Sequence, residues 1–134
     1  MNSVLRELIE IYKPGDIDWM GFHKPSKQNF TYHHIVEKRN GGEKTLENGA
    51  ILTQKSHRLL NDIDEKAHEY YDYINHEFRL LNDSKMPPSE DYYTNMARLV
   101  FEAQLVLKAN LALQQEKEDE NKNYEGYQRT YHEE

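Results

Sequence analysis

Residues 33–61 read HHIVEKRNGGEKTLENGAILTQKSHRLLN, and no other part of the chain says as much about its structure. The stretch opens inside an aromatic and β-branched segment, residues 30–36, which predicts a strand. The Asn-Gly-Gly sequence at residues 40–42 predicts a turn, because glycine adopts the backbone angles that tight turns require. Residues 50–53 predict a second short strand, and a helix is expected directly after them.

Three histidines and two asparagines of this stretch are candidates for chemistry. His33 and His34 lie on the first expected strand, and Asn48 lies at the end of the loop. His57 and Asn61 are four residues apart on the expected helix, so they share one face. Two imidazoles and an amide oxygen could bind one divalent metal ion and leave positions open, as catalytic metal sites do. A further imidazole beside the ion could take a proton from water, because histidine titrates near neutral pH.

The order and spacing of these residues resemble the HNH motif of the ββα-metal (His-Me finger) endonucleases. That motif sets a metal ligand and a histidine side by side, an asparagine about 15 residues later and a histidine about nine residues after that. Here Asn48 follows His34 by 14 residues and precedes His57 by 9. The Gly-Gly pair and the segment ENGAIL also match the usual loop and second strand. The resemblance covers about 30 of the 134 residues.

The resemblance implies a role for each candidate. His34 matches the general base that activates water, and Asn48 matches the residue that bonds the loop backbone. His33 and His57 match metal ligands, with Asn61 where some members place an additional ligand. The implied cofactor is one divalent metal ion, namely magnesium, manganese, zinc or nickel. Histidine rather than aspartate at position 33 suits zinc, nickel, cobalt or manganese better than magnesium.

Two further expectations concern the surroundings of this site. Lys38, Arg39 and Arg58 are candidates for binding phosphate, and spacing alone does not choose among them. Neighbouring residues of a regular strand point to opposite faces, so we expect a local irregularity at His33 and His34.

The rest of the chain predicts mostly helix. Residues 3–12 predict a short amphipathic helix and residues 13–29 a connecting loop. From residue 54 to about residue 81, apolar residues recur every three or four positions, which indicates either one long helix or two helices broken near residues 62–64. Ser89 is a good helix N-cap for a second long amphipathic helix.

These elements predict an α+β fold, with a ββα-metal unit preceded by a short helix and followed by a long helical hairpin. We expect one domain over residues 1–117, with its core at about residues 30–62 and a helical extension at about residues 63–117. Residues 118–134 are polar and acidic and predict a tail with little intrinsic order.

Charge is divided unevenly along the chain. The net charge of the 134 residues is -7, yet residues 1–62 hold 9 Lys/Arg and 8 Asp/Glu, whereas residues 63–134 hold 8 and 16. The near-neutral part is therefore the better candidate for approaching nucleic acid, with DNA as the expected partner and RNA not excluded. The chain has no cysteine, and no apolar run approaches the roughly 18 residues of a membrane helix, so we expect a cytoplasmic protein without a membrane partner.

Other functions stay open at this point. The favoured one is a metal-dependent endonuclease that hydrolyses phosphodiester bonds in DNA, with a protein partner supplying targeting and a phage or mobile element as its setting. The alternative is a catalytically silent HNH-fold binding protein, for example a phage-encoded inhibitor or regulator of host defence acting in the host cell cytoplasm. A third is a helical interaction protein in which residues 63–115 fold and bind alone. A homodimer through the C-terminal helices is a further open arrangement.

Overall fold

The computed structural model describes residues 2–133, with side chains through Lys122. Over these residues the protein has an α+β fold with four α-helices and one two-stranded antiparallel sheet, so the predicted fold class is confirmed at this level. In chain order the elements are α1 (Ser3–Tyr12), β1 (Thr31–His34), η1 (Lys38–Asn40), η2 (Leu46–Asn48), β2 (Gly49–Leu52), α2 (Gln54–Lys66), α3 (His68–Ser84) and α4 (Glu90–Glu133), where η denotes a 3-10 helix.

The sheet forms from the two strands that the sequence predicts, joined by the glycine-bearing loop. His33 lies opposite Ala50 and His34 opposite Gly49, and all four residues of β2 are buried. The expected irregularity at His33 and His34 is the end of the strand and not a bulge. Pairing stays regular through His34, where β1 ends, so the two side chains leave the strand on opposite faces.

The long periodic segment after β2 is two helices, not one. The break falls at Ala67 (φ -145°, ψ 50°), a few residues later than the expected position near residues 62–64. Leu60 and Ile63 are buried on the inner face of α2, and this packing stabilises the helix beyond its acidic residues. Ser89 begins the last helix as predicted, since its hydroxyl accepts a hydrogen bond from the Tyr92 amide at 3.1 Å.

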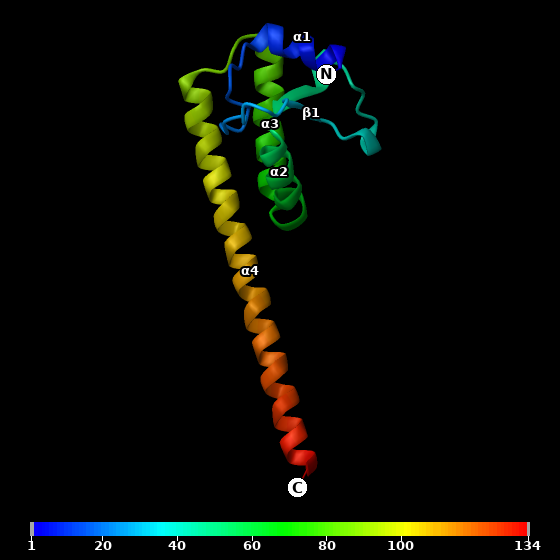
Figure 1. The fold of residues 1–134 in the computed structure, drawn as a ribbon, viewed down its shortest axis with the longest axis vertical. Coiled ribbons are helices and arrows are strands. Elements are labelled where there is room, and N and C mark those ends of the chain that lie inside the picture. The colour runs from blue at the N-terminus through cyan, green and yellow to red at the C-terminus, as the bar shows by residue number, and fades with distance from the viewer. Residues whose placement is uncertain (1, 134) are drawn as a thin grey trace.

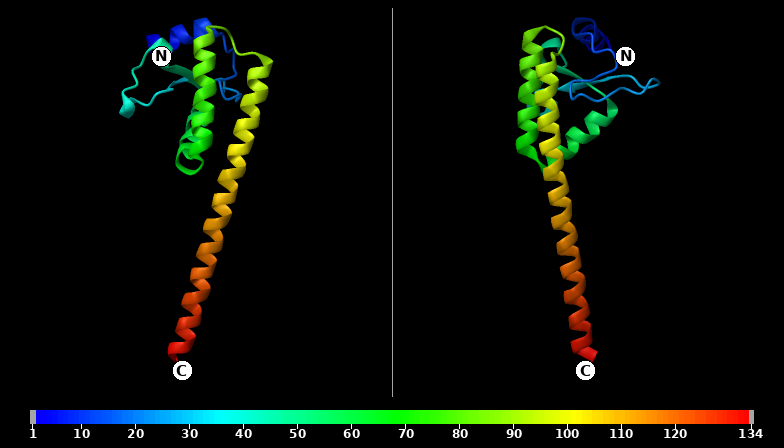
Figure 2. Two further views of the ribbon diagram at one scale, coloured as in Figure 1. Left: turned by 180° about the vertical axis from the view of Figure 1, so that it is seen from behind. Right: turned by 90° about the vertical axis from the view of Figure 1, so that its left-hand side faces the viewer.

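The core lies between the sheet and the helices. Figure 1 shows α1 across one end of the body, with α3 and α4 side by side and antiparallel, and the second view of Figure 2 shows α2 diverging from this pair. The largest side chains of the core are Tyr12, Trp19 and Phe78, and the Tyr12 and Trp19 rings meet edge to face at 4.9 Å. Trp19 comes from the loop of residues 13–29, which is therefore a packed part of the core.

Helix α4 runs well beyond the body (Figures 1 and 2). It extends to Glu133, so the expectation of a tail with little order over residues 118–134 differs from the helix found there. This segment is rich in Glu and contains no proline, so no helix-breaking proline stops a helix already begun. Among residues 2–133, no helix combines the length and apolar character needed to cross a bilayer.

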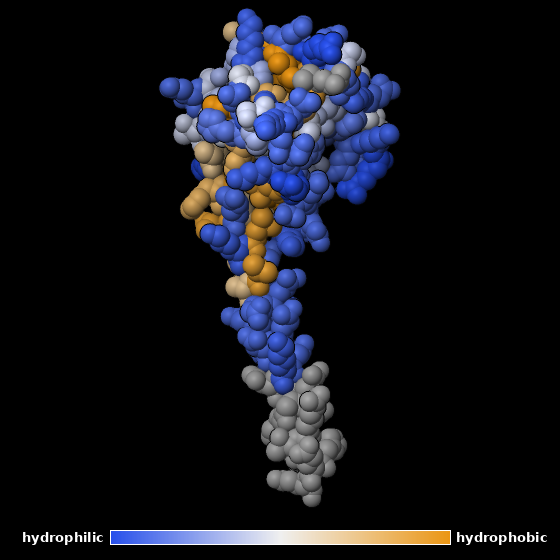
Figure 3. All heavy atoms as spheres, in the orientation of Figure 1, coloured by the Kyte–Doolittle hydropathy of each residue, from blue (hydrophilic) through white to orange (hydrophobic). Residues whose placement is uncertain are grey.

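Figure 3 shows apolar side chains following α4 out of the body before the surface becomes hydrophilic. These residues are Phe101, Leu105, Leu111 and Leu113, each between 49% and 64% exposed.

Candidate functional site

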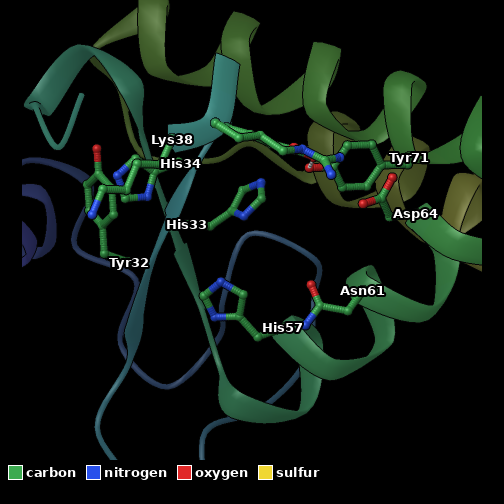
Figure 4. A pocket seen from close by; sticks show the side chains of 10 residues that line it. Tyr32, His33, His34, Lys38, His57, Asn61, Asp64 and Tyr71 are labelled. Atoms are coloured by element: carbon green, nitrogen blue, oxygen red, sulfur yellow. Dashed lines mark hydrogen bonds and ion pairs between the residues drawn. The ribbon is translucent and has the colours of Figure 1, made fainter. Parts of the chain in front are cut away.

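A surface pocket lies where β1, the loop after it, α2 and the start of α3 meet (Figure 4). Four of the five histidine and asparagine candidates line this pocket, although they come from separate elements. The lining residues are Tyr32, His33, His34, Glu37, Lys38, Arg39, His57, Asn61, Asp64 and Tyr71.

His33 is one of the two most buried members of the site, with 7% of its surface exposed. Its ring lies edge-on to the rings of Phe78 and His57, with centroids 5.6 Å away in both cases. Its Nε2 lies 2.8 Å from Oδ1 of Asn75, a buried amide on α3. Burial lowers the pKa of His33 to about 4, partly opposed by the Asn75 hydrogen bond, so the ring is neutral at neutral pH.

His57 lies opposite His33 on the first turns of α2. The two rings meet edge to face, and Asn61 lies beside them on the next helical turn (Figure 4). Nδ1 of His57 is 2.5 Å from Oγ1 of Thr31, which comes from β1. Burial lowers the pKa of His57, while the carboxylate of Asp18 acts in the opposite direction. This ring is therefore also neutral at neutral pH.

The position of α2, and hence of His57, is fixed by a buried carboxylate. Asp18 is fully buried, and its Oδ2 accepts a hydrogen bond from the Thr53 amide at 2.7 Å. Thr53 is the N-cap of α2, since its hydroxyl accepts from the Ser56 amide at 3.1 Å. The other oxygen of Asp18 accepts from the amides of Met20 and Phe22. The loop of residues 13–29 therefore holds the first turn of α2 in place.

His34 lies on the other face of β1, beside Tyr32, and still lines the pocket (Figure 4). The rings of Tyr32 and His34 meet edge to face at 4.9 Å. Burial lowers the pKa of His34, and the positive charges of Lys44 and Lys38 lower it further. A neutral, half-exposed imidazole with two lysines nearby can accept a proton where a phosphate would be attracted.

Asn48 does not line the pocket but fixes the loop beside it. Its Oδ1 accepts from the Val36 amide at 2.8 Å, and its Nδ2 donates to the carbonyls of Val36 and Glu43, both at 3.0 Å. This bonding to the loop backbone is what the resemblance implies for this position. Gly42 is needed for the same contact, because a Cβ there would lie 1.8 Å from the Val36 carbonyl oxygen.

The three phosphate-binding candidates are placed differently. Lys38 and Arg39 line the pocket. Arg39 forms an ion pair with Glu37, so the positive charge of Arg39 is largely neutralised. Glu37 also accepts a hydrogen bond from the Tyr71 hydroxyl at 2.7 Å. Arg58 follows His57 on α2 and points to another side of the helix, outside the pocket lining of the described residues.

Several residues of the site were not among the sequence candidates. Of these, Asn75 and Thr31 contact the imidazoles of His33 and His57, and Lys44 lies near His34. One signal for Asn75 was available, because it is an amide on the mainly apolar face of α3 next to Ile74 and Phe78. Thr31 and Lys44 are ordinary choices for a strand and a loop and carried no such signal.

The two imidazoles and one amide of the pocket give three candidate metal donors only when the amide is counted. No group of three or more His, Cys, Asp or Glu side chains within the described residues is arranged to hold a metal ion. The pocket instead offers two neutral imidazoles, from His33 and His57, and the amide of Asn61, with the carboxylates of Glu37 and Asp64 on its lining. Neutral imidazole is the form that binds zinc, nickel and manganese, so the chemistry of the donors is suitable.

Comparison with family models, with curated proteins and with solved structures found no match to this chain. The interpretation of the pocket therefore depends on its own residues and on the motif that they form.

Proposed function

We propose that the protein is a metal-dependent endonuclease of the HNH (ββα-metal) class that hydrolyses phosphodiester bonds in DNA. One observation carries the proposal. His33 from the first strand and His57 from the helix, in the order and spacing of the motif, have ring centroids 5.6 Å apart on one pocket, with Asn61 beside them. Strand, loop, strand and helix follow one another as the motif requires.

The metal would be held by His33, His57 and Asn61. When bound there, a divalent ion supplies Lewis-acid polarisation of the scissile phosphate and neutralises charge on the leaving oxygen. The two imidazoles are neutral at neutral pH because burial lowers both pKa values, so no proton has to be displaced before they bind. Imidazole ligands favour manganese, nickel or zinc over magnesium.

His34 is the proposed general base. Its ring is neutral at neutral pH and lies on the pocket, so it can take a proton from a water molecule that attacks phosphorus. Asn48 and Gly42 keep the loop against the end of β1, which holds the backbone of His34 in place. Lys38 and Lys44 provide the positive charge that draws a phosphate to this side of the pocket.

The direct test is cleavage of supercoiled plasmid by the purified protein with Mn²⁺, Mg²⁺, Ni²⁺ or Zn²⁺, and with EDTA as the metal-free reaction. We expect nicked or linear product with at least one ion and none with EDTA. His34→Ala should lower the rate by roughly 10²–10⁴-fold, which is the usual contribution of a general base. His57→Ala should abolish cleavage and weaken metal binding.

His76→Ala is the matched control, because His76 is an exposed histidine of α3 outside this pocket. It should cleave at the wild-type rate, and circular dichroism should report equal helix content in all variants. Absence of cleavage of plasmid, single-stranded DNA and RNA with all four ions would refute the proposal. Cleavage of RNA alone would change the proposed substrate from DNA to RNA and would support the proposed phosphodiester hydrolysis.

A second candidate is an HNH-fold binding protein without turnover. The observation that favours it is the set of exposed apolar residues on α4, namely Phe101, Leu105, Leu111 and Leu113, of which Phe101 and Leu105 lie one helical turn apart and offer a surface to a protein partner. This function predicts no cleavage, together with a partner interaction that Leu105→Ser and Leu111→Ser weaken and His34→Ala leaves unchanged.

A further inference from the structure

The imidazoles of His33 and His57 each form a hydrogen bond with a side chain. That side chain is in turn hydrogen-bonded to a main-chain carbonyl. A carbonyl oxygen can only accept a hydrogen bond, so it determines the direction of every bond in such a chain. The protonated nitrogen of each ring can therefore be worked out from the contacts.

The first chain runs from α3 to His33. Nδ2 of Asn75 lies 3.1 Å from the Tyr71 carbonyl, so the amide group of Asn75 must present its N–H there. The opposite side of the same amide, Oδ1, then faces Nε2 of His33 at 2.8 Å. Because Oδ1 has no hydrogen to give, Nε2 of His33 must carry the proton.

The second chain runs across the sheet to His57. Oγ1 of Thr31 lies 3.1 Å from the Leu52 carbonyl and donates its single hydrogen there. The same oxygen lies 2.5 Å from Nδ1 of His57 and can now only accept. Nδ1 of His57 must therefore carry the proton.

We propose that Asn75 and Thr31 are positioning residues that hold His33 as the Nε2–H tautomer and His57 as the Nδ1–H tautomer, which leaves His33 Nδ1 and His57 Nε2 as the nitrogens that bind the cation. The assignment of tautomers stands on the hydrogen bonds alone, whereas the part about the cation rests on the proposed function. Such outer hydrogen bonds orient a ligand ring and fix its tautomer, and their loss lowers metal affinity by roughly 10–100-fold.

The tautomers can be measured on the metal-free, full-length protein at neutral pH. Long-range ¹H–¹⁵N correlation spectra distinguish protonated from unprotonated imidazole nitrogens, and we expect protons on Nε2 of His33 and Nδ1 of His57. Thr31→Val removes the hydroxyl with little change of shape and should give His57 a mixture of tautomers. Thr31→Ser keeps the hydroxyl and should restore the wild-type spectrum.

Metal affinity gives a second measurement that does not depend on cleavage. Titration calorimetry with Zn²⁺ should give a dissociation constant roughly 10–100-fold higher for Thr31→Val than for the wild type, with Thr31→Ser close to the wild type. Asn75→Leu should act in the same direction through His33. Because Asn75 is buried and its replacement also disturbs the packing of α3, the Thr31 pair is the decisive comparison.

A proton on His33 Nδ1 or His57 Nε2 in the wild type would overturn the inference, as would unchanged spectra and zinc affinity in Thr31→Val. These failures can be told apart from failure of the proposed function. Reversed tautomers in a protein that cleaves plasmid would refute only the inference. The expected tautomers and affinity losses in a protein that cleaves nothing would support the inference and refute the nuclease.

Discussion

At the scale of single residues, the surroundings of His33 matter most. The ring is 7% exposed, packs against Phe78 and is bonded by Asn75, so water does not solvate a charge there. Protonation is unfavourable in such a place, and the pKa falls to about 4. The same burial that keeps the ring neutral must make folding sensitive to acid.

We therefore predict a loss of stability in mild acid that His33 causes. Below pH 6.5 the His33 ring binds a proton in the unfolded protein, whereas in the folded protein it stays neutral until about pH 4. The contribution of His33 to the free energy of unfolding is therefore complete above pH 6.5 and is lost as the pH falls toward 4. The loss amounts to about 3 kcal/mol. His33→Gln keeps an N–H for Asn75 but cannot titrate, so its free energy of unfolding in urea should fall less steeply over this range. Parallel curves for the two proteins would contradict the described burial of His33.

At the scale of elements, the start of α2 decides where His57 lies. A helix of 13 residues could enter the pocket at many angles, but Asp18 and Thr53 fix its first turn by bonds to main-chain amides. Asp18 accepts three such bonds in a fully buried position. The geometry of the site is therefore determined partly by a loop that contributes no residue to it.

Asp18→Asn should loosen this attachment. The amide that replaces one carboxylate oxygen cannot accept, so at least one buried N–H loses its partner at a cost of about 1.5–3 kcal/mol. We expect urea unfolding to report this loss and Zn²⁺ titration to report weaker binding. Asp16→Asn is the matched control, because Asp16 is exposed in the same loop, and it should change stability by less than about 0.5 kcal/mol. Equal stability of both variants would show that α2 is fixed in another way.

The elements also show how far sequence reasoning reaches. Periodicity predicted the helices, because burial on one face is a local property that repeats along the chain, and residue composition predicted the first strand. The break at Ala67 was predicted a few residues too early, since acidic residues on a solvated face do not end a helix. Within the site, His33, His57 and Asn61 belong to one compact motif whose spacing limits their positions. Asn75 lies 42 residues from His33 along the chain, and no local pattern predicts a contact of that kind.

At the scale of the whole molecule, much of the net negative charge lies in a segment that contributes none of the described residues of the histidine pocket. Residues 116–134 carry 7 acidic and 3 basic side chains, more than half of the net charge of -7. Residues 116–133 belong to the part of α4 that extends beyond the body (Figure 1). The described residues 116–122 are exposed, so this segment adds little to the core.

A chain truncated after Gln115 should keep its fold and bind DNA more tightly. Its free energy of unfolding should stay within about 0.5 kcal/mol of the full chain, because only exposed positions are removed from the described part. Its affinity for plasmid at low salt should rise, and the difference should shrink as salt screens the lost repulsion. Filter binding of the His34→Ala form, with and without the truncation, measures this without cleavage. A gain that persists at high salt would indicate that the segment covers the DNA-binding surface directly.

The hydrogen-bond chains behind His33 and His57 end on the carbonyls of Tyr71 and Leu52, and this has a consequence for mutational tolerance. Every amino acid supplies a main-chain carbonyl, so point mutation cannot delete the acceptors at positions 71 and 52. Side chains there can change while the protons on both rings stay where they are. The tautomers of both rings therefore depend on the side chains of Asn75 and Thr31. Few other amino acids offer the same donor and acceptor at these two positions.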